Sequence, residues 1–110
     1  MHASGSRVHG DSPGINRDLV AKVINEHLVE IQRCYERALL SHTDLGGKVT
    51  LEWVITVEGT VRSARTKSST LKVASVEGCM LTALKSWRFP HAVGGDVTVS
   101  YPVILDPVGF

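Results

Sequence analysis

The chain lacks any apolar run that approaches the roughly 18 residues needed to cross a bilayer, and it lacks an excess of charge. Its 12 basic and 11 acidic side chains are interspersed, and the net charge of +1 gives little attraction toward nucleic acid or anionic lipid. Two cysteines are too few for a disulfide framework but suffice for one bridge. We therefore expect no nucleic-acid partner and no cysteine-rich scaffold.

Residue types that carry catalysis or bind metals do not occur at the spacings these functions need. The histidines are scattered, and neither cysteine has a nearby second ligand of the kind found in zinc sites. Gly46-Gly47-Lys48 lacks the upstream glycine and the following hydroxyl residue of a phosphate-binding loop, and it indicates a turn. We predict no catalytic residue, no metal and no cofactor, and we expect a non-enzymatic binding module.

With 110 residues and 43% hydrophobic side chains, the chain is long enough for one domain with a single core and too short for two. Residues 1–14 are rich in glycine, serine and histidine, and we interpret them as a flexible leader that begins with a cloning remnant. Val8 is the only branched aliphatic residue in this leader and could extend an edge strand at most. Residues 15–110 then form the domain, and we expect the natural chain to be longer.

A long amphipathic helix is predicted from Asn16 to about Ser41. Apolar residues recur there at three- and four-residue steps, and Asn16 has the side chain and the position of an N-cap. His27 lies near the apolar stripe, and we interpret it as a packed histidine rather than a catalytic base. Glu26 and Glu30 fall on the polar side, where they form a mildly unfavourable like-charge pair.

A second, shorter helix is predicted from Val73 to Trp87 by the same spacing. Pro90 prevents its continuation and displaces the preceding residue, Phe89, from helical geometry. Gly78 lies inside the pattern, where glycine costs about 1 kcal/mol relative to alanine. This cost suggests that a neighbouring backbone approaches Gly78 closely.

Three segments alternate apolar and polar residues with the period of a half-buried strand. The first runs from Val49 to Val57. Glu58-Gly59 connects it to a less regular strand from Thr60 to about Thr66, in which a bulge would explain the broken alternation. The third runs from Val97 to Leu105, and because Pro102 has no N–H, its nitrogen should face a free edge or a bulge.

The element order of helix, strand, strand, helix and strand predicts an α+β fold. Two helices packed on one face of a small three-stranded antiparallel sheet would bury both apolar stripes together with Trp53 and Trp87. A right-handed crossover through the second helix places the last strand beside the first, which becomes central. The last strand is then left with one free edge.

Cys34 and Cys79 each lie on the apolar face of a predicted helix, and both helices should cover the same side of the sheet. Two interpretations stay open from the residues alone. The thiols could pack as small hydrophobic groups, or they could form a helix–helix disulfide that closes a loop of about 45 residues.

The last strand is β-branched and nearly uncharged, which is a liability at an open sheet edge. Two interpretations are again open. Pro102 and the C-terminal tail could blunt the edge, or a partner's extended segment could add to it as a further strand. A small α/β nucleic-acid binder is less favoured, because the outer sheet face offers Thr50, Glu52 and Val54 instead of stacking aromatics.

A series of short motifs occurs in order between Ile15 and about Leu105. They are Ile31-Gln32-Arg33-Cys34-Tyr35-Glu36, Leu45-Gly46-Gly47-Lys48-Val49, Gly59-Thr60-Val61, Ser68-Ser69-Thr70-Leu71, Val76-Glu77-Gly78-Cys79, Trp87-Arg88-Phe89-Pro90, Gly94-Gly95 and Tyr101-Pro102. In this order and at these spacings, the chain resembles the TonB C-terminal-like family. Within that family it is most similar to the AgmX/PglI C-terminal domains of myxobacterial gliding-motility proteins.

The resemblance implies a periplasmic domain at the end of a longer protein anchored in the inner membrane. Such proteins transmit work from a proton-driven inner-membrane motor to outer-membrane or periplasmic partners, here in gliding motility or outer-membrane energisation. The final strand of TonB relatives accepts an extended partner segment, and Pro102 would limit docking largely to residues 97–101. The candidate partner-binding residues are Val97, Thr98, Val99, Ser100, Tyr101 and Val103.

The resemblance has two further implications. An oxidising periplasm favours a Cys34–Cys79 disulfide over two free thiols. The alternative function is structural self-association, as an edge-paired or strand-swapped homodimer.

Overall fold

The computed structural model describes residues 2–3, 9–10, 15–71 and 73–106. These residues form two helices, three long strands and two short ones. The elements are β1 (His2–Ala3), β2 (His9–Gly10), α1 (Arg17–Leu39), β3 (Gly47–Ile55), β4 (Val61–Ser69), α2 (Ala74–Lys85) and β5 (Val97–Leu105). The long strands form an antiparallel sheet in the order β5-β3-β4. The predicted α+β class, the element order and the central first long strand are confirmed.

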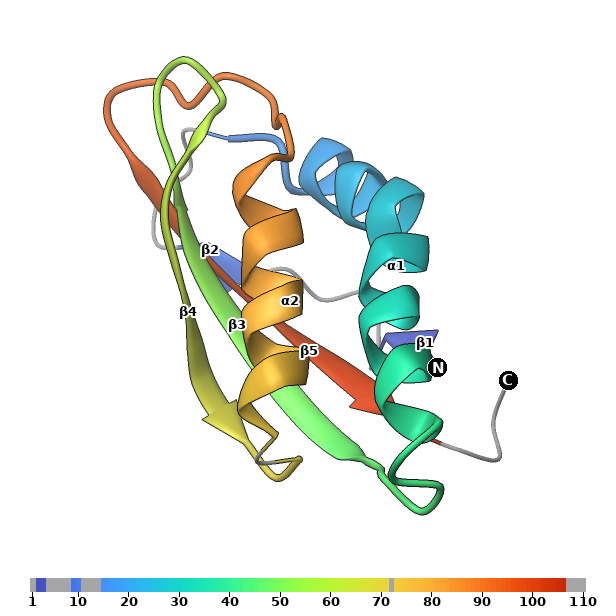
Figure 1. The fold of residues 1–110 in the computed structure, drawn as a ribbon. Helices are drawn as coiled ribbons and strands as arrows, with labels where there is room; N and C mark the ends of the chain where they lie inside the picture. Colours follow the sequence, from blue (N-terminus) through green and yellow to red (C-terminus); the bar gives the residue numbers. More distant parts are fainter. Residues whose placement is uncertain (1, 4–8, 11–14, 72, 107–110) are drawn as a thin grey trace.

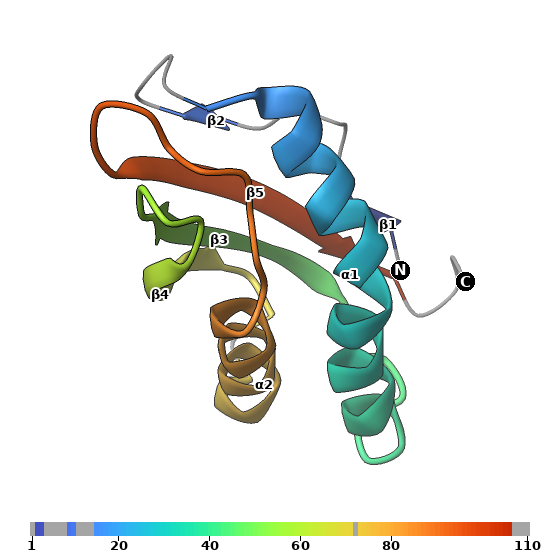
Figure 2. The same ribbon diagram turned by 90° about the horizontal axis from the view of Figure 1, so that it is seen from above.

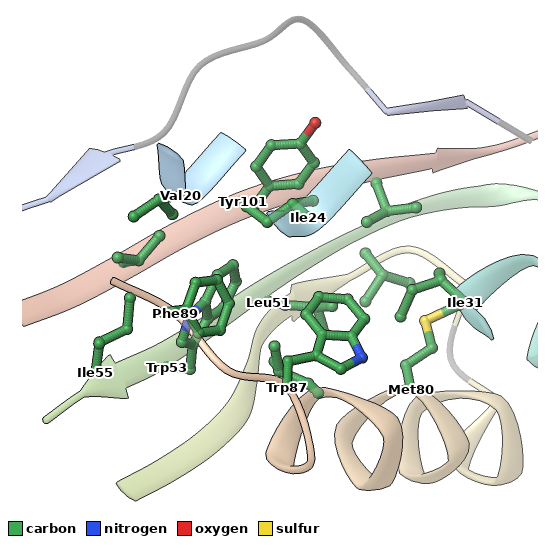
Figure 3. Close-up of a cluster of buried hydrophobic side chains, with 14 of the residues drawn as sticks. Val20, Ile24, Ile31, Leu51, Trp53, Ile55, Met80, Trp87, Phe89 and Tyr101 are labelled. Carbon is green, nitrogen blue, oxygen red and sulfur yellow. The ribbon is translucent and has the colours of Figure 1, made fainter. Parts of the chain in front are cut away.

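Both helices pack on the same face of the sheet (Figure 1). Helix α2 contacts β4 and α1. Helix α1 begins on the β5 side of the sheet, as the view from above shows (Figure 2). The hydrophobic core lies between the helices and this face. Its side chains include Trp53 and Phe89, whose ring centroids are 5.7 Å apart, and Val20 and Ile24, which lie near Tyr101 (Figure 3).

Helix α1 begins where the sequence predicts. The side-chain oxygen of Asn16 accepts hydrogen bonds from the backbone N–H groups of Asp18 at 2.9 Å and Leu19 at 3.1 Å, so it satisfies two of the otherwise unpaired donors of the first turn. The helix ends at Leu39, slightly before the predicted Ser41. No helix in the described ranges is long and apolar enough to cross a membrane.

The turn between β3 and β4 is locked to the segment that follows α2. Gly59 has a φ of +84°, and its carbonyl accepts a hydrogen bond of 2.9 Å from the N–H of Phe89. A Cβ at this position would lie 2.2 Å from the Phe89 carbonyl oxygen, so only glycine fits. The predicted irregularity of the hairpin is confirmed, because the β3–β4 register shifts between Thr50 and Leu51 and again between Val54 and Ile55.

The prediction for Gly78 is wrong. A Cβ built at Gly78 meets no heavy atom within 4 Å, and the residue is exposed on α2. The glycine therefore serves no close packing that the structure shows. Both tryptophans, by contrast, are in the core as predicted, with Trp53 1% and Trp87 3% exposed.

Two interactions fasten α1 to α2. Cys34 and Cys79 form a disulfide with a Cα–Cα distance of 5.7 Å, which joins residues 45 positions apart. Trp87, which follows the end of α2, stacks on His27 in the middle of α1, with ring centroids 4.9 Å apart and an interplanar angle of 18°. His27 is thus a packed histidine, as the sequence predicts.

Glu30 adds hydrogen bonds to this contact between His27 and Trp87, a role that its place on the polar side of the predicted helix does not indicate. Its carboxylate accepts a hydrogen bond of 3.1 Å from the Trp87 indole N–H and lies 2.6 Å from His27 Nδ1. Partial burial raises the pKa of Glu30, but the hydrogen bonds from His27 and Trp87 outweigh it and bring the pKa below its usual value.

Candidate docking edge

The side chains of β5 alternate strictly between a buried and a half-buried face. Val97, Val99, Tyr101 and Val103 are at most 3% exposed and lie under the helices, while Thr98 and Ser100 belong to the half-buried set on the open face of the sheet. Burial raises the pKa of the Tyr101 hydroxyl. Among the six predicted partner-binding residues, only Thr98 and Ser100 therefore have side chains that are partly exposed, and the Ser100 hydroxyl already donates a hydrogen bond to Glu52. The side chains of the other four are buried under the helices.

The hydrogen-bonding direction of each β5 residue follows from the pairing of β3. The Lys48 carbonyl accepts a hydrogen bond of 2.9 Å from the Thr70 N–H, so the backbone groups of Lys48 face the β4 side. In an antiparallel sheet this direction alternates along the strand, so the backbone N–H and C=O groups of all even-numbered β3 residues point toward β4.

The β5 residues opposite these positions must turn their backbone groups away from β3. The β3–β5 register is unbroken and pairs the even-numbered residues of β3 with Thr98, Ser100, Pro102 and Ile104. The nitrogen of Pro102 consequently faces the outer edge, where its missing N–H costs no bond to β3. This orientation agrees with the sequence-based expectation for Pro102.

The prediction of a free outer edge on β5 is wrong. Strand β1 pairs antiparallel with Val103 and Ile104, and β2 pairs antiparallel with Val99 and Ser100 (Figure 1). Neither strand pairs with residues 101 and 102, at the point where proline interrupts the row of donors. An uncharged β-branched edge is unfavourable when open, and here the preceding chain covers it.

Almost no feature of the sequence indicates these two strands. Their composition, histidine with alanine or glycine, has low strand propensity. Val8 was the one hint of an edge strand, and it lies outside the described residues, as do residues 1, 4–7 and 11–14 of the predicted leader. The division into a leader and a domain stays a prediction.

The opposite edge of the sheet, on β4, has a different character. It carries the exposed basic side chains Arg62, Arg65 and Lys67, and its pairing with β3 is irregular at two places. Within the described part of the chain, no strand pairs with its outer side. Charge and irregularity are features that discourage strand addition at an open edge.

The open face of the sheet beside β5 is polar. A shallow groove there is lined by Lys48, Thr50, Glu52, Lys67, Thr98, Ser100 and Pro102. Glu52 accepts hydrogen bonds from Arg65 Nε at 2.8 Å and from the Ser100 hydroxyl at 3.3 Å, and the Arg65 bond is the main reason that the pKa of Glu52 lies below its usual value. No group of three or more His, Cys, Asp or Glu side chains within the described ranges could hold a metal ion.

Neither a family model nor a curated protein sequence matches the chain. Among solved structures, the fold is similar to the C-terminal domain of TonB from Pseudomonas aeruginosa, with a TM-score of 0.49 and 20% sequence identity over 66% of this chain and 75% of that one. It is also similar to the C-terminal domain of Helicobacter pylori TonB, with a TM-score of 0.49 and 14% identity over 86% of this chain and 85% of that one. Both are distant likenesses in fold, and the narrower resemblance to gliding-motility proteins stays a prediction.

Proposed function

We propose that this domain is a non-enzymatic docking module that binds an extended segment of a partner protein by strand addition at the outer edge of β5. The observation that supports this proposal is that the edge already pairs with added strands, since β1 and β2 lie against it. An edge that pairs with short segments of its own chain has the geometry to pair with a segment of another chain. The basic, irregular edge of β4 lacks these features.

The register defines what kind of segment fits. Paired residues project their side chains to the same face, so partner residues opposite Thr98 and Ser100 lie over the polar groove. Partner residues opposite Val99 and Tyr101 lie on the helix side of the sheet, near the buried face of α1. A segment that alternates polar and apolar residues, and that ends before Pro102, matches both faces.

The fold suits a domain that carries load. A pull on β5 along its axis is shared by its pairing with β3, which continues without a break over nine residues. Strand β3 pairs in turn with β4, and the disulfide ties the two covering helices together. Strand addition at β5 would therefore connect a partner to the most extensively paired part of the sheet.

In the fuller form of the proposal, the domain belongs to an envelope-spanning transducer driven by the proton-motive force. It would lie in the periplasm, linked through chain outside the domain to an inner-membrane proton-channel motor. Its partner would be an outer-membrane or periplasmic protein, in gliding motility or outer-membrane energisation. The support for this part is the sequence resemblance described above.

The proposal can be tested by mapping amide chemical shifts of the ¹⁵N-labelled domain during titration with synthetic peptides from candidate envelope partners. We expect the largest shifts at Thr98 and Ser100, with β4 unaffected. Shifts confined to α1, with β5 silent, would exclude docking at this edge.

A further inference from the structure

Strand β2 lies on the stretch of edge that the proposed function assigns to the partner. His9 is paired with Ser100 and Gly10 with Val99, both before Pro102, whereas β1 pairs only beyond it. The backbone groups of Ser100 face outward and those of Val99 face β3, by the alternation derived above. The pair of His9 and Ser100 is therefore the hydrogen-bonded one, and the pair of Gly10 and Val99 is not.

We propose, resting on the proposed function, that β2 is a resident strand that closes the docking stretch and that a partner segment binds by replacing it. The described part of β2 has two residues, so one hydrogen-bonded pair holds it at this place. A partner segment that spans residues 97–101 also reaches the outward-facing groups of Thr98. It can make an additional pair of main-chain bonds and can therefore displace β2.

The short connection makes β2 an effective competitor despite its size. Only residues 11–16 separate β2 from the start of α1, and a short tether holds a strand at an effective concentration on the order of millimolar. Apparent affinity falls in proportion to the fraction of molecules in which the edge is open. Extended segments that bind weakly and non-specifically would thus fail to displace β2. Segments that form main-chain hydrogen bonds with both Thr98 and Ser100 would displace it.

Proline and alanine substitutions at His9 distinguish the effect of its main-chain hydrogen bond from the effect of its side chain. His9→Pro removes the N–H that faces Ser100, and His9→Ala removes the same imidazole while it keeps the N–H. Gly10→Pro is a second control, because the Gly10 N–H belongs to the pair that does not hydrogen-bond to β5. Loss of one main-chain hydrogen bond should lower the equilibrium constant for the pairing of β2 with β5 about fivefold.

Amide hydrogen exchange at Ser100 directly measures how often β2 leaves the outer edge of β5. In the unaltered chain, the Ser100 amide should exchange slowly, and His9→Pro should accelerate it about fivefold, while His9→Ala and Gly10→Pro leave it within about twofold. The Val99 amide, which faces β3, should be unchanged in all variants and reports that the fold is intact. Rapid exchange of Ser100 in the unaltered chain would overturn the proposal.

Strand exchange is then tested in trans with a synthetic peptide of residues 5–14 of this chain, titrated into each labelled variant. We expect shifts at Ser100, with a Kd for the His9→Pro variant about fivefold lower than for the unaltered chain and the two controls. Equal affinity in all four proteins would overturn the resident-strand proposal and leave strand addition standing. Failure of the peptide to shift Ser100 in any variant, at several millimolar, would count against strand addition itself.

Discussion

Breaking the disulfide should remove a large part of the domain's stability. Cys34 and Cys79 are 45 positions apart, and the chain-entropy relation for a loop of this length gives a loss of about 4 kcal/mol in the free energy of unfolding. Domains of this size are stable by about 5–15 kcal/mol, so the bridge separates a robust fold from a marginal one. The effect acts mainly on the unfolded chain, which the bridge keeps compact.

Urea denaturation followed by circular dichroism, with and without a reductant, measures this loss. The reduced protein should unfold at a lower urea concentration and with a steeper dependence on urea, because its unfolded state exposes more surface. The double variant Cys34→Ala with Cys79→Ala should behave like the reduced protein and should not respond to reductant. If reductant leaves the unfolding midpoint of the unaltered protein unchanged, the bridge does not stabilise the fold as argued.

Two further predictions concern glycine and the helix interface. Gly59→Ala should lower the free energy of unfolding by at least about 2 kcal/mol, because the residue has a φ of +84° and its new Cβ would meet the Phe89 carbonyl oxygen at 2.2 Å. Gly78→Ala is its matched control and should raise stability by up to about 1 kcal/mol, since it adds helix propensity in open space; the reverse order in thermal unfolding would contradict both assignments. Glu30 has a lowered pKa, so its stabilising effect is complete above its unfolded-state pKa, near the usual 4.5, and is lost as the pH falls through the folded value. Glu30→Gln keeps an acceptor for the Trp87 N–H but cannot titrate. Between pH 6 and pH 3, the free energy of unfolding of this variant should therefore fall less than that of the unaltered protein. If the two free energies fall in parallel, Glu30 does not stabilise the fold through its charge.

Much of the fold could be predicted because the relevant signals are local. Apolar spacing along α1 and α2, alternation along β3 and β5, and the capping side chain of Asn16 each report a structure that short-range sequence determines. The bulged return strand could be anticipated from its broken alternation, but the places of its register shifts could not. They depend on how β4 fits against a neighbour along its whole length.

The parts that could not be predicted are set by contacts between distant residues. Glu30 looks like a solvent-facing helix residue until the tertiary structure brings the Trp87 indole N–H to it, 57 positions away. Strands β1 and β2 carry no strand pattern, and they form where β5 offers unpaired backbone groups. The same contact changes the candidate site from an open edge to an edge with resident strands.

Whether β5 is the docking edge is tested most directly by replacing Thr98 with proline and, separately, with alanine. Both changes remove the hydroxyl, but only proline removes the outward-facing N–H, and it does so in the same phase as the natural Pro102 and at a position with which β2 does not pair. For an envelope-partner peptide that binds the unaltered domain, we predict that Thr98→Pro weakens binding about fivefold or more and that Thr98→Ala changes it by less than about twofold. Equal binding by the two variants, with both folded by urea denaturation, would contradict strand addition at β5.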